Sequence, residues 1–94
     1  MTDDVEIRRR RAIYRALHRG TKEMDHLVGR FASARVAGMA SGDLEHFERF
    51  LALPDPLLQA WFFAHSEPVA EFSMLVIELR RFHGLTEAAA PSKN

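Results

Sequence analysis

The stretch HRGTKEMDHLVGRF, residues 18–31, joins a glycine turn to the most regular apolar pattern in the sequence. Four of its side chains recur at the i, i+3, i+4 and i+7 spacing that places them on one face of a helix: Met24, Leu27, Val28 and Phe31. Gly20, just before them, can end a preceding helix because glycine adopts a positive φ at no steric cost. The stretch therefore predicts two helices that meet at a tight turn.

Helical spacing continues on both sides of this turn, and no segment alternates polar and apolar residues as a strand would. The five predicted helices cover residues 5–19, 21–38, 43–53, 56–64 and 68–83. Besides the four above, the side chains expected inside are Ile13, Ala16, Leu17, Leu44, Phe47, Leu51, Leu57, Leu58, Trp61, Phe62, Phe72, Leu75, Val76 and Leu79. We predict an all-α fold, a small five-helix bundle, because such short connections make successive helices antiparallel or angled neighbours.

Capping residues mark several of the predicted helix ends. Asp55 before Pro56 is typical of a helix start, with Asp55 as the N-cap and Pro56 at the first helical position. Ser41 or Asp43 is expected to cap the third helix. Gly84 is expected to cap the last helix at its carboxyl end.

Length and composition indicate a single domain, residues 1–94, with an ordered core at about residues 5–84 and a frayed tail at 85–94. Thirteen basic and thirteen acidic residues cancel, so no net field attracts nucleic acid or a membrane. The chain has no cysteine, which excludes disulfides and thiolate metal sites and fits a reducing compartment. No apolar run approaches the ~18 residues of a membrane span, and the start, MTDDVE, lacks the apolar segment of a secretory signal. We expect the bacterial cytoplasm, with a processed protein of the mitochondrial matrix as the alternative.

Patterns that would carry catalysis or bind a metal are missing from the sequence. No two of its histidines lie three or four residues apart, as helical metal sites require: His18, His26, His46, His65 and His83. There is no GxSxG nucleophile motif and no glycine-rich phosphate loop. We predict no catalytic residue, no metal site and no stably bound cofactor.

Four arginines fall on one face of the first predicted helix: Arg8, Arg11, Arg15 and Arg19. Three interpretations remain open, namely a solvated face, a stripe that contacts phosphates, and a basic surface for an acidic protein partner. The balanced charge of the chain weighs against nucleic acid.

Three apolar residues lie off the predicted core stripes: Phe63, Met74 and Ile77. Burial against another helix is the expected explanation, since some helices of a bundle are covered on two sides. An exposed patch at these positions would instead indicate a partner or dimer surface.

The turn itself admits a structural and a functional interpretation. Glu23 and Asp25 lie in or next to the first turn of the second helix, where carboxylates favour the helix dipole. Arg19 and Glu23, however, are not needed for a cap. They place opposite charges beside Gly20, where the missing side chain lets another backbone approach closely.

The turn and its surroundings resemble the succinate dehydrogenase flavinylation factor family, also called the FAD assembly factor family. Its RGxxE motif is matched by Arg19, Gly20 and Glu23, followed by Asp25. The resemblance extends to FxxxLxLPDPLLxxW at residues 47–61 and covers about residues 8–83. His18 and Thr21 depart from the residues more usual beside the motif, and Met24 replaces the commoner leucine.

The resemblance implies a five-helix protein that binds the flavoprotein subunit of succinate dehydrogenase, or of fumarate reductase, and promotes covalent attachment of FAD to it. It implies that FAD belongs to the flavoprotein and that the factor is not an enzyme. The residues expected to bind this partner are Arg15, Arg19, Gly20, Glu23 and Asp25. We expect a monomer. The alternative function is a small helical adaptor or antitoxin-like regulator, associated with nucleic acid through the arginine stripe.

Overall fold

A computed structural model describes residues 2–63 and 66–85 of the chain. It contains five α-helices: α1 (Thr2–Leu17), α2 (Lys22–Arg35), α3 (Ser41–Leu51), α4 (Asp55–Phe62) and α5 (Ser73–Phe82). Two short 3₁₀ turns, Val36–Gly38 and Ala70–Phe72, follow α2 and precede α5. The prediction of an all-α, five-helix fold is therefore confirmed. Apart from Leu85, the predicted tail lies outside the described residues, as does Ala64, the last residue of the fourth predicted helix.

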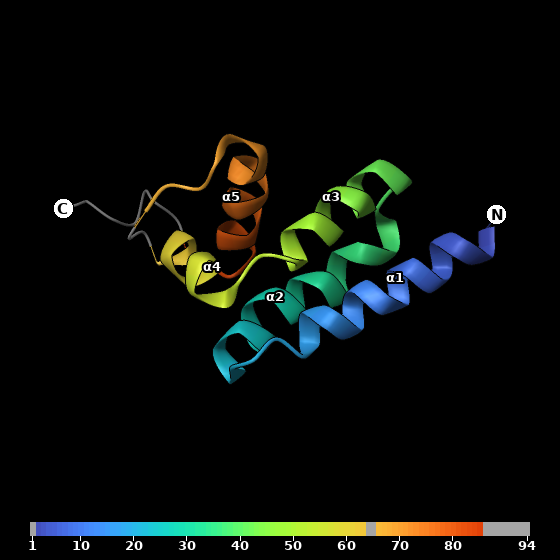
Figure 1. The fold of residues 1–94 in the computed structure, drawn as a ribbon, viewed down its shortest axis with the longest axis horizontal. Helices are drawn as coiled ribbons and strands as arrows, with labels where there is room; N and C mark the ends of the chain where they lie inside the picture. The colour runs from blue at the N-terminus through green and yellow to red at the C-terminus, as the bar shows by residue number, and fades with distance from the viewer. Residues whose placement is uncertain (1, 64–65, 86–94) are drawn as a thin grey trace.

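The helices α1 and α2 form an antiparallel pair, and α3 returns along them (Figure 1). The helices α4 and α5 cover the end of this group that carries the turn between α1 and α2 (Figure 1). The molecule is elongated, with extents of 50 × 24 × 21 Å. No helix of the described residues is both long and apolar enough to cross a membrane.

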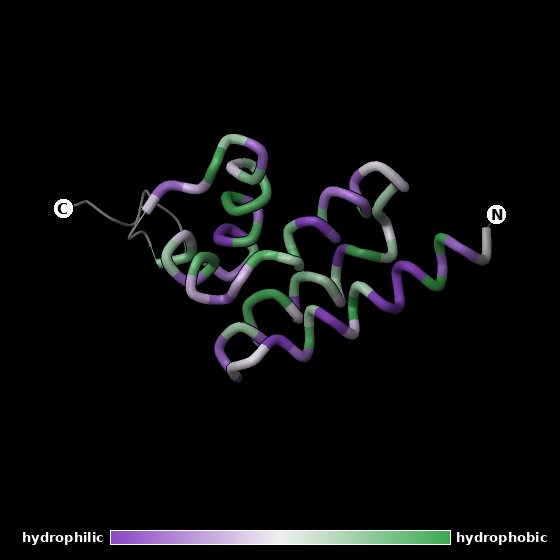
Figure 2. The backbone as a smooth tube through the Cα atoms, viewed as in Figure 1, coloured by the Kyte–Doolittle hydropathy of each residue, from purple (hydrophilic) through white to green (hydrophobic). Residues whose placement is uncertain are grey.

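Each helix alternates apolar and polar segments, as Figure 2 shows, and the apolar side chains form one continuous core. All four residues of the predicted α2 stripe are buried, as are those expected on α3 and α5. Burial of each large side chain is worth about 1.5–3 kcal/mol, so these stripes supply most of the driving force for folding. The expectation was wrong for Leu17 and Leu57, which are 39% and 37% exposed, whereas Ala12 and Phe50 are buried without having been predicted.

Several predicted helix starts differ from the observed ones. The N-cap of α3 is Ala40, not Ser41 or Asp43, and the hydroxyl of Ser41 instead accepts a hydrogen bond from Arg8. The N-cap of α4 is Pro54, which leaves the carboxylate of Asp55 available for a tertiary contact. The fifth helix begins five residues after the predicted Pro68, because an extended segment and a 3₁₀ turn precede it.

The carboxyl end of α5 follows the prediction. Gly84 has a φ of 76°, the left-handed conformation that only glycine adopts without strain. The amide of Gly84 donates to the carbonyl of Arg81, and that of Leu85 donates to the carbonyl of Arg80. These two bonds form a Schellman motif, which satisfies carbonyls that the helix leaves without partners.

A close approach between α1 and α2 depends on a glycine that the sequence did not single out. A Cβ atom on Gly29 would lie 2.6 Å from Cδ2 and 3.1 Å from Cα of Leu17. The missing side chain therefore lets the last residue of α1 pack directly on the backbone of α2.

We predict that Gly29→Ala lowers the free energy of unfolding by about 1–2 kcal/mol, because the added methyl group forces α1 away from α2. Gly38→Ala is the matched control, since nothing lies within 4 Å of its added Cβ. Urea denaturation, monitored by circular dichroism, measures the free energy of unfolding of both variants. A stabilised Gly29→Ala variant, as helix propensity alone would give, contradicts the close packing.

Candidate functional site

The turn between α1 and α2, residues 18–21, is held by hydrogen bonds from both helices. The ring Nδ1 of His18 lies 2.8 Å from the carbonyl of Tyr14 and donates to it, since a carbonyl only accepts. The hydroxyl of Thr21 accepts from the amide of Met24 at 3.1 Å and caps α2. The carboxylate of Asp25 accepts from the backbone amide of Arg19. Three of the four residues of the turn are therefore engaged in hydrogen bonds, two through their side chains and Arg19 through its backbone amide.

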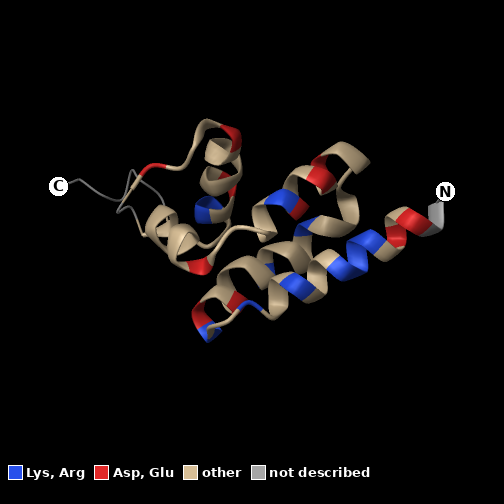
Figure 3. Ribbon diagram, in the orientation of Figure 1, with Lys and Arg blue, Asp and Glu red and all other residues tan. Residues whose placement is uncertain are grey.

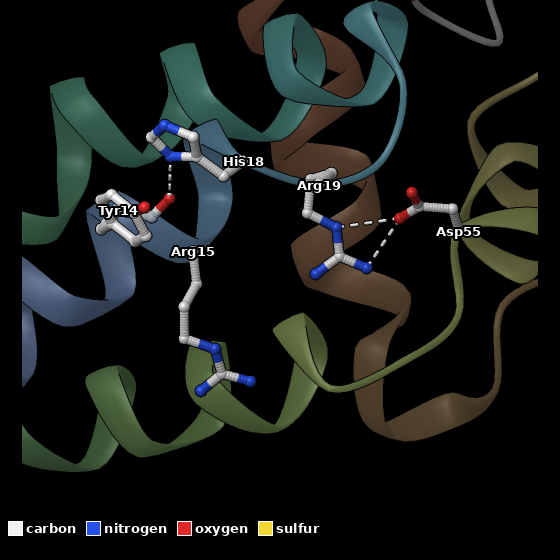
Figure 4. Close-up of a pocket in the computed structure, with 5 residues that line it drawn as sticks. All are labelled: Tyr14, Arg15, His18, Arg19 and Asp55. Atoms are coloured by element: carbon white, nitrogen blue, oxygen red, sulfur yellow. Dashed lines mark hydrogen bonds and ion pairs between the residues drawn. The ribbon is translucent and has the colours of Figure 1, made fainter.

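The side chain of Arg19 leaves the turn and crosses to the connection between α3 and α4 (Figure 4). Its Nε donates to Oδ1 of Asp55 at 2.9 Å, and its Nη2 lies 2.7 Å from the same oxygen. Its Nη1 donates to the carbonyl of Leu51, the last residue of α3, and Nη2 to the carbonyl of Leu53 at 2.7 Å. The side chain is only 9% exposed. Arg19 thus supplies donors at the carboxyl end of α3, so the expectation that no cap needs it was wrong.

Gly20 has a different structural role from the predicted one. Among the glycines of the described residues only Gly84 has a positive φ, so Gly20 does not end α1 by a left-handed conformation. A Cβ atom at Gly20 would instead lie 3.1 Å from Oδ2 of Asp55. The absence of a side chain gives the Asp55 carboxylate the space it needs beside the turn.

The predicted partner-binding residues therefore divide into two groups. Arg19 and the half-buried Asp25 are engaged within the protein. Glu23, Arg15 and Gly20 are exposed, and neither Glu23 nor Arg15 has a side-chain partner within the described part of the chain. Figure 3 shows acidic and basic residues side by side at this turn. The turn is thus held by internal hydrogen bonds and flanked by free charges of both signs, Arg15 on α1 and Glu23 on α2.

Two open depressions flank the Arg19–Asp55 pair. One, of about 370 Å³, is lined by Tyr14, Arg15 and His18 together with the pair (Figure 4). The rings of Tyr14 and His18 stack there with centroids 4.1 Å apart, although Tyr14 is 63% exposed. The second depression, of about 400 Å³, is lined by Glu23, Pro56, Gln59, Ala60 and Phe63. The depression next to α1 is therefore aromatic and basic, whereas the depression between α2 and α4 is acidic and apolar.

The predicted arginine stripe is interrupted at both ends. Arg8 donates to both carboxylate oxygens of Glu48, at 3.2 and 2.9 Å, and these hydrogen bonds raise its pKa. Arg19 lies beyond the end of α1 and is paired with Asp55. Only Arg11 and Arg15 of the four remain exposed, which weakens the phosphate-contacting interpretation.

The apolar residues off the core stripes are more exposed than expected. Phe63 is 39% and Met74 is 68% exposed, whereas Ile77 is half-buried. Burial against another helix is therefore the wrong explanation for the first two. Phe63 lies in the depression beside Glu23, and Met74 lines a separate groove with Phe31 and His46.

Asp55 was predicted from the sequence only as a helix N-cap, not as a residue of this site. The Asp55-Pro56 pair is an adequate signal for the start of α4, so a local explanation concealed the contact with Arg19, 36 residues away. Tyr14 was not singled out from the sequence, whereas Phe63 already lay off the predicted core stripes, and both are exposed beside the turn.

We predict that Arg19→Ala lowers the free energy of unfolding by about 2–3 kcal/mol, because Asp55 and two carbonyl groups lose a charged donor. Arg15→Ala removes the same type of side chain from an exposed position of α1 and should change stability by less than about 0.5 kcal/mol. Thermal unfolding measures both variants. Equal, small effects would show that the bonds of Arg19 do not hold the two connections together.

Comparison with known proteins identifies the family to which the chain belongs. Residues 10–83 match the family model described as flavinator of succinate dehydrogenase. The chain is 44% identical over 61 residues to the FAD assembly factor SdhE of Acetobacter pasteurianus, covering 65% of this chain and 56% of that protein. It is 29% identical over 80 residues to the mitochondrial succinate dehydrogenase assembly factor 2 of Dictyostelium discoideum, covering 85% and 57%. It is 32% identical over 62 residues to the FAD assembly factor SdhE of Legionella pneumophila, covering 66% and 78%.

The matched segments span a little more than half the length of the Acetobacter and Dictyostelium relatives. No solved structure matches the chain. The region matched by the family model contains the whole turn and its partner Asp55, so the resemblance expected from the RGxxE motif is confirmed at the level of the family. The chain belongs to the flavinator of succinate dehydrogenase family.

Proposed function

We propose that this protein binds the flavoprotein subunit of succinate dehydrogenase and promotes the covalent attachment of FAD to it. The flavoprotein subunit is called the client below. The family match over residues 10–83 is the observation that carries this proposal, together with the names of the relatives as FAD and succinate dehydrogenase assembly factors. The related subunit of fumarate reductase is a second proposed client. Bacterial relatives support the bacterial cytoplasm as the proposed compartment.

The turn at residues 18–21 is the proposed docking element. Glu23 and Arg15 are exposed, lack partners among the described residues and bear opposite charges, so both are free to make charge-assisted hydrogen bonds to the client. Gly20 is an exposed part of this element, and its missing side chain leaves room for the Asp55 carboxylate that helps to hold the turn. Arg19 and Asp25 contribute from within, because their bonds keep the turn in one conformation before docking. A preformed surface loses less conformational entropy on binding than a flexible one.

In this proposal the factor positions the client and performs no chemistry itself. The resemblance implies that FAD is attached to a histidine of the client. The factor holds a client conformation in which this histidine and the flavin are correctly oriented, and orientation alone can lower a barrier by several kcal/mol, up to about 7–11 kcal/mol in favourable cases. FAD is assigned to the client. Binding sites for molecules of this size enclose most of the ligand, whereas the depressions beside the turn are open to solvent and hold about 370 and 400 Å³.

Covalent flavin on the client tests this proposal. The client is expressed without a factor, with this protein, with Glu23→Ala and with Glu78→Ala, and flavin fluorescence is read in a denaturing gel. We expect a fluorescent band with this protein and with Glu78→Ala, and a band reduced by about tenfold with Glu23→Ala, because a free charge at the interface is lost. Glu78 is the matched control, since it is an exposed glutamate on α5.

The stability of Glu23→Ala must be measured alongside. The carboxylate lies in the first turn of α2, so its removal should cost only about 0.3–1 kcal/mol through the helix dipole. Equal fluorescence in all four lanes would contradict the proposed function. Unfolding of Glu23→Ala to the extent of a core substitution would contradict the assignment of Glu23 to a docking surface.

A further inference from the structure

We propose that Asp55 is a positioning residue for docking, which holds Arg19 inside the protein and thereby joins the turn and α4 into one client-binding surface. This inference rests on the proposed function, since it concerns how the same surface is built. Asp55 is the first residue of α4 and acts on the client through Arg19 rather than by direct contact.

The two carboxylate oxygens of Asp55 have separate tasks. Oδ1 accepts from Nε of Arg19 at 2.9 Å and lies 2.7 Å from its Nη2. Oδ2 faces the space above Gly20, where a Cβ atom would come within 3.1 Å. Asp55 therefore holds both residues of the arginine–glycine pair at once, one by an ion pair and the other by close packing.

This arrangement leaves Arg19 unable to serve as a free ligand for the client. All three guanidinium nitrogens donate to Asp55 or to the carbonyls of Leu51 and Leu53, and the side chain is 9% exposed. Withdrawing it would leave a largely desolvated carboxylate and two carbonyls without donors, which is costly. Arg19 therefore links the α1–α2 turn to the end of α3 and the start of α4, and this link is called the strut below.

The strut determines which side chains meet on the surface. Arg19 joins the turn that precedes α2 to the end of α3 and the start of α4. Glu23 of α2 lines the same depression as Pro56 and Gln59 of α4 and Phe63, the residue that follows α4. Loss of the strut lets α4 shift relative to α2, so that Glu23 and the partly exposed ring of Phe63 no longer form one continuous surface.

The first part of the test uses the free protein. In nitrogen-15 spectra of the wild type, the Nε–H signal of Arg19 should be protected from solvent exchange by its hydrogen bond. Asp55→Asn keeps the shape of the side chain but removes its charge, and should lose this protection by at least about tenfold. Asp43→Asn is the matched control, because Asp43 occupies the first turn of α3 and is exposed. Undiminished protection in Asp55→Asn would overturn the assignment of Asp55.

The second part measures affinity for the purified, FAD-loaded client by biolayer interferometry, at a temperature where every variant is folded. Asp55→Asn and Arg19→Gln should each weaken binding roughly tenfold, and the double variant no further, because the two residues act as one unit. Asp43→Asn should leave the affinity unchanged. If Asp55→Asn does not fold, Arg19→Lys replaces it, since lysine keeps a charge but lacks the planar fork.

The outcomes separate the inference from the proposed function. Additive losses in the double variant would mean that Asp55 touches the client directly, and would overturn the positioning role. Wild-type affinity in Asp55→Asn, with the protection of Arg19 lost, would overturn it as well while leaving the proposed function intact. No binding by the wild type would overturn the proposed function, and the positioning role with it.

Discussion

The ion pair between Arg19 and Asp55 is the interaction on which the rest of the site depends. It spans 36 residues of sequence and joins the α1–α2 turn to the α3–α4 connection. The guanidinium also donates to carbonyls at the end of α3. One side chain therefore supplies donors to the carboxyl end of α3 and holds the first residue of α4. The partly buried setting makes this pair worth more than the surface ion pair between Arg49 and Glu45, whose partners are 51% and 67% exposed.

The pair also explains why two residues of the RGxxE motif are engaged within the protein while the third is not. A side chain at Gly20 would crowd the Asp55 carboxylate, which lies next to it. The side chain of Arg19 is long enough to reach the same carboxylate. Glu23 follows on the next helix turn and is left free. Two residues of the RGxxE motif thus shape the surface, while the third is available to a partner.

Local patterns in the sequence were sufficient to predict the helices. The apolar spacing of α2 identifies its buried face because one helix period determines it, and Gly84 predicts the end of α5 because a Schellman motif needs a left-handed residue. The tertiary role of Arg19 could not be predicted in this way. Its partner lies 36 residues away, and Asp55 already had a local explanation beside Pro56. The same limit hid the contact of Gly29 with Leu17, which depends on how two helices approach.

Hydrogen exchange of this protein, alone and mixed with the flavoprotein subunit, tests whether the turn and α4 form one docking surface. We expect binding to slow exchange at residues 19–25 and 56–63, the two segments that line the surface beside Glu23, and to leave residues 74–81 of α5 unchanged. Slower exchange confined to α5 and α3, with the turn unaffected, would contradict this expectation.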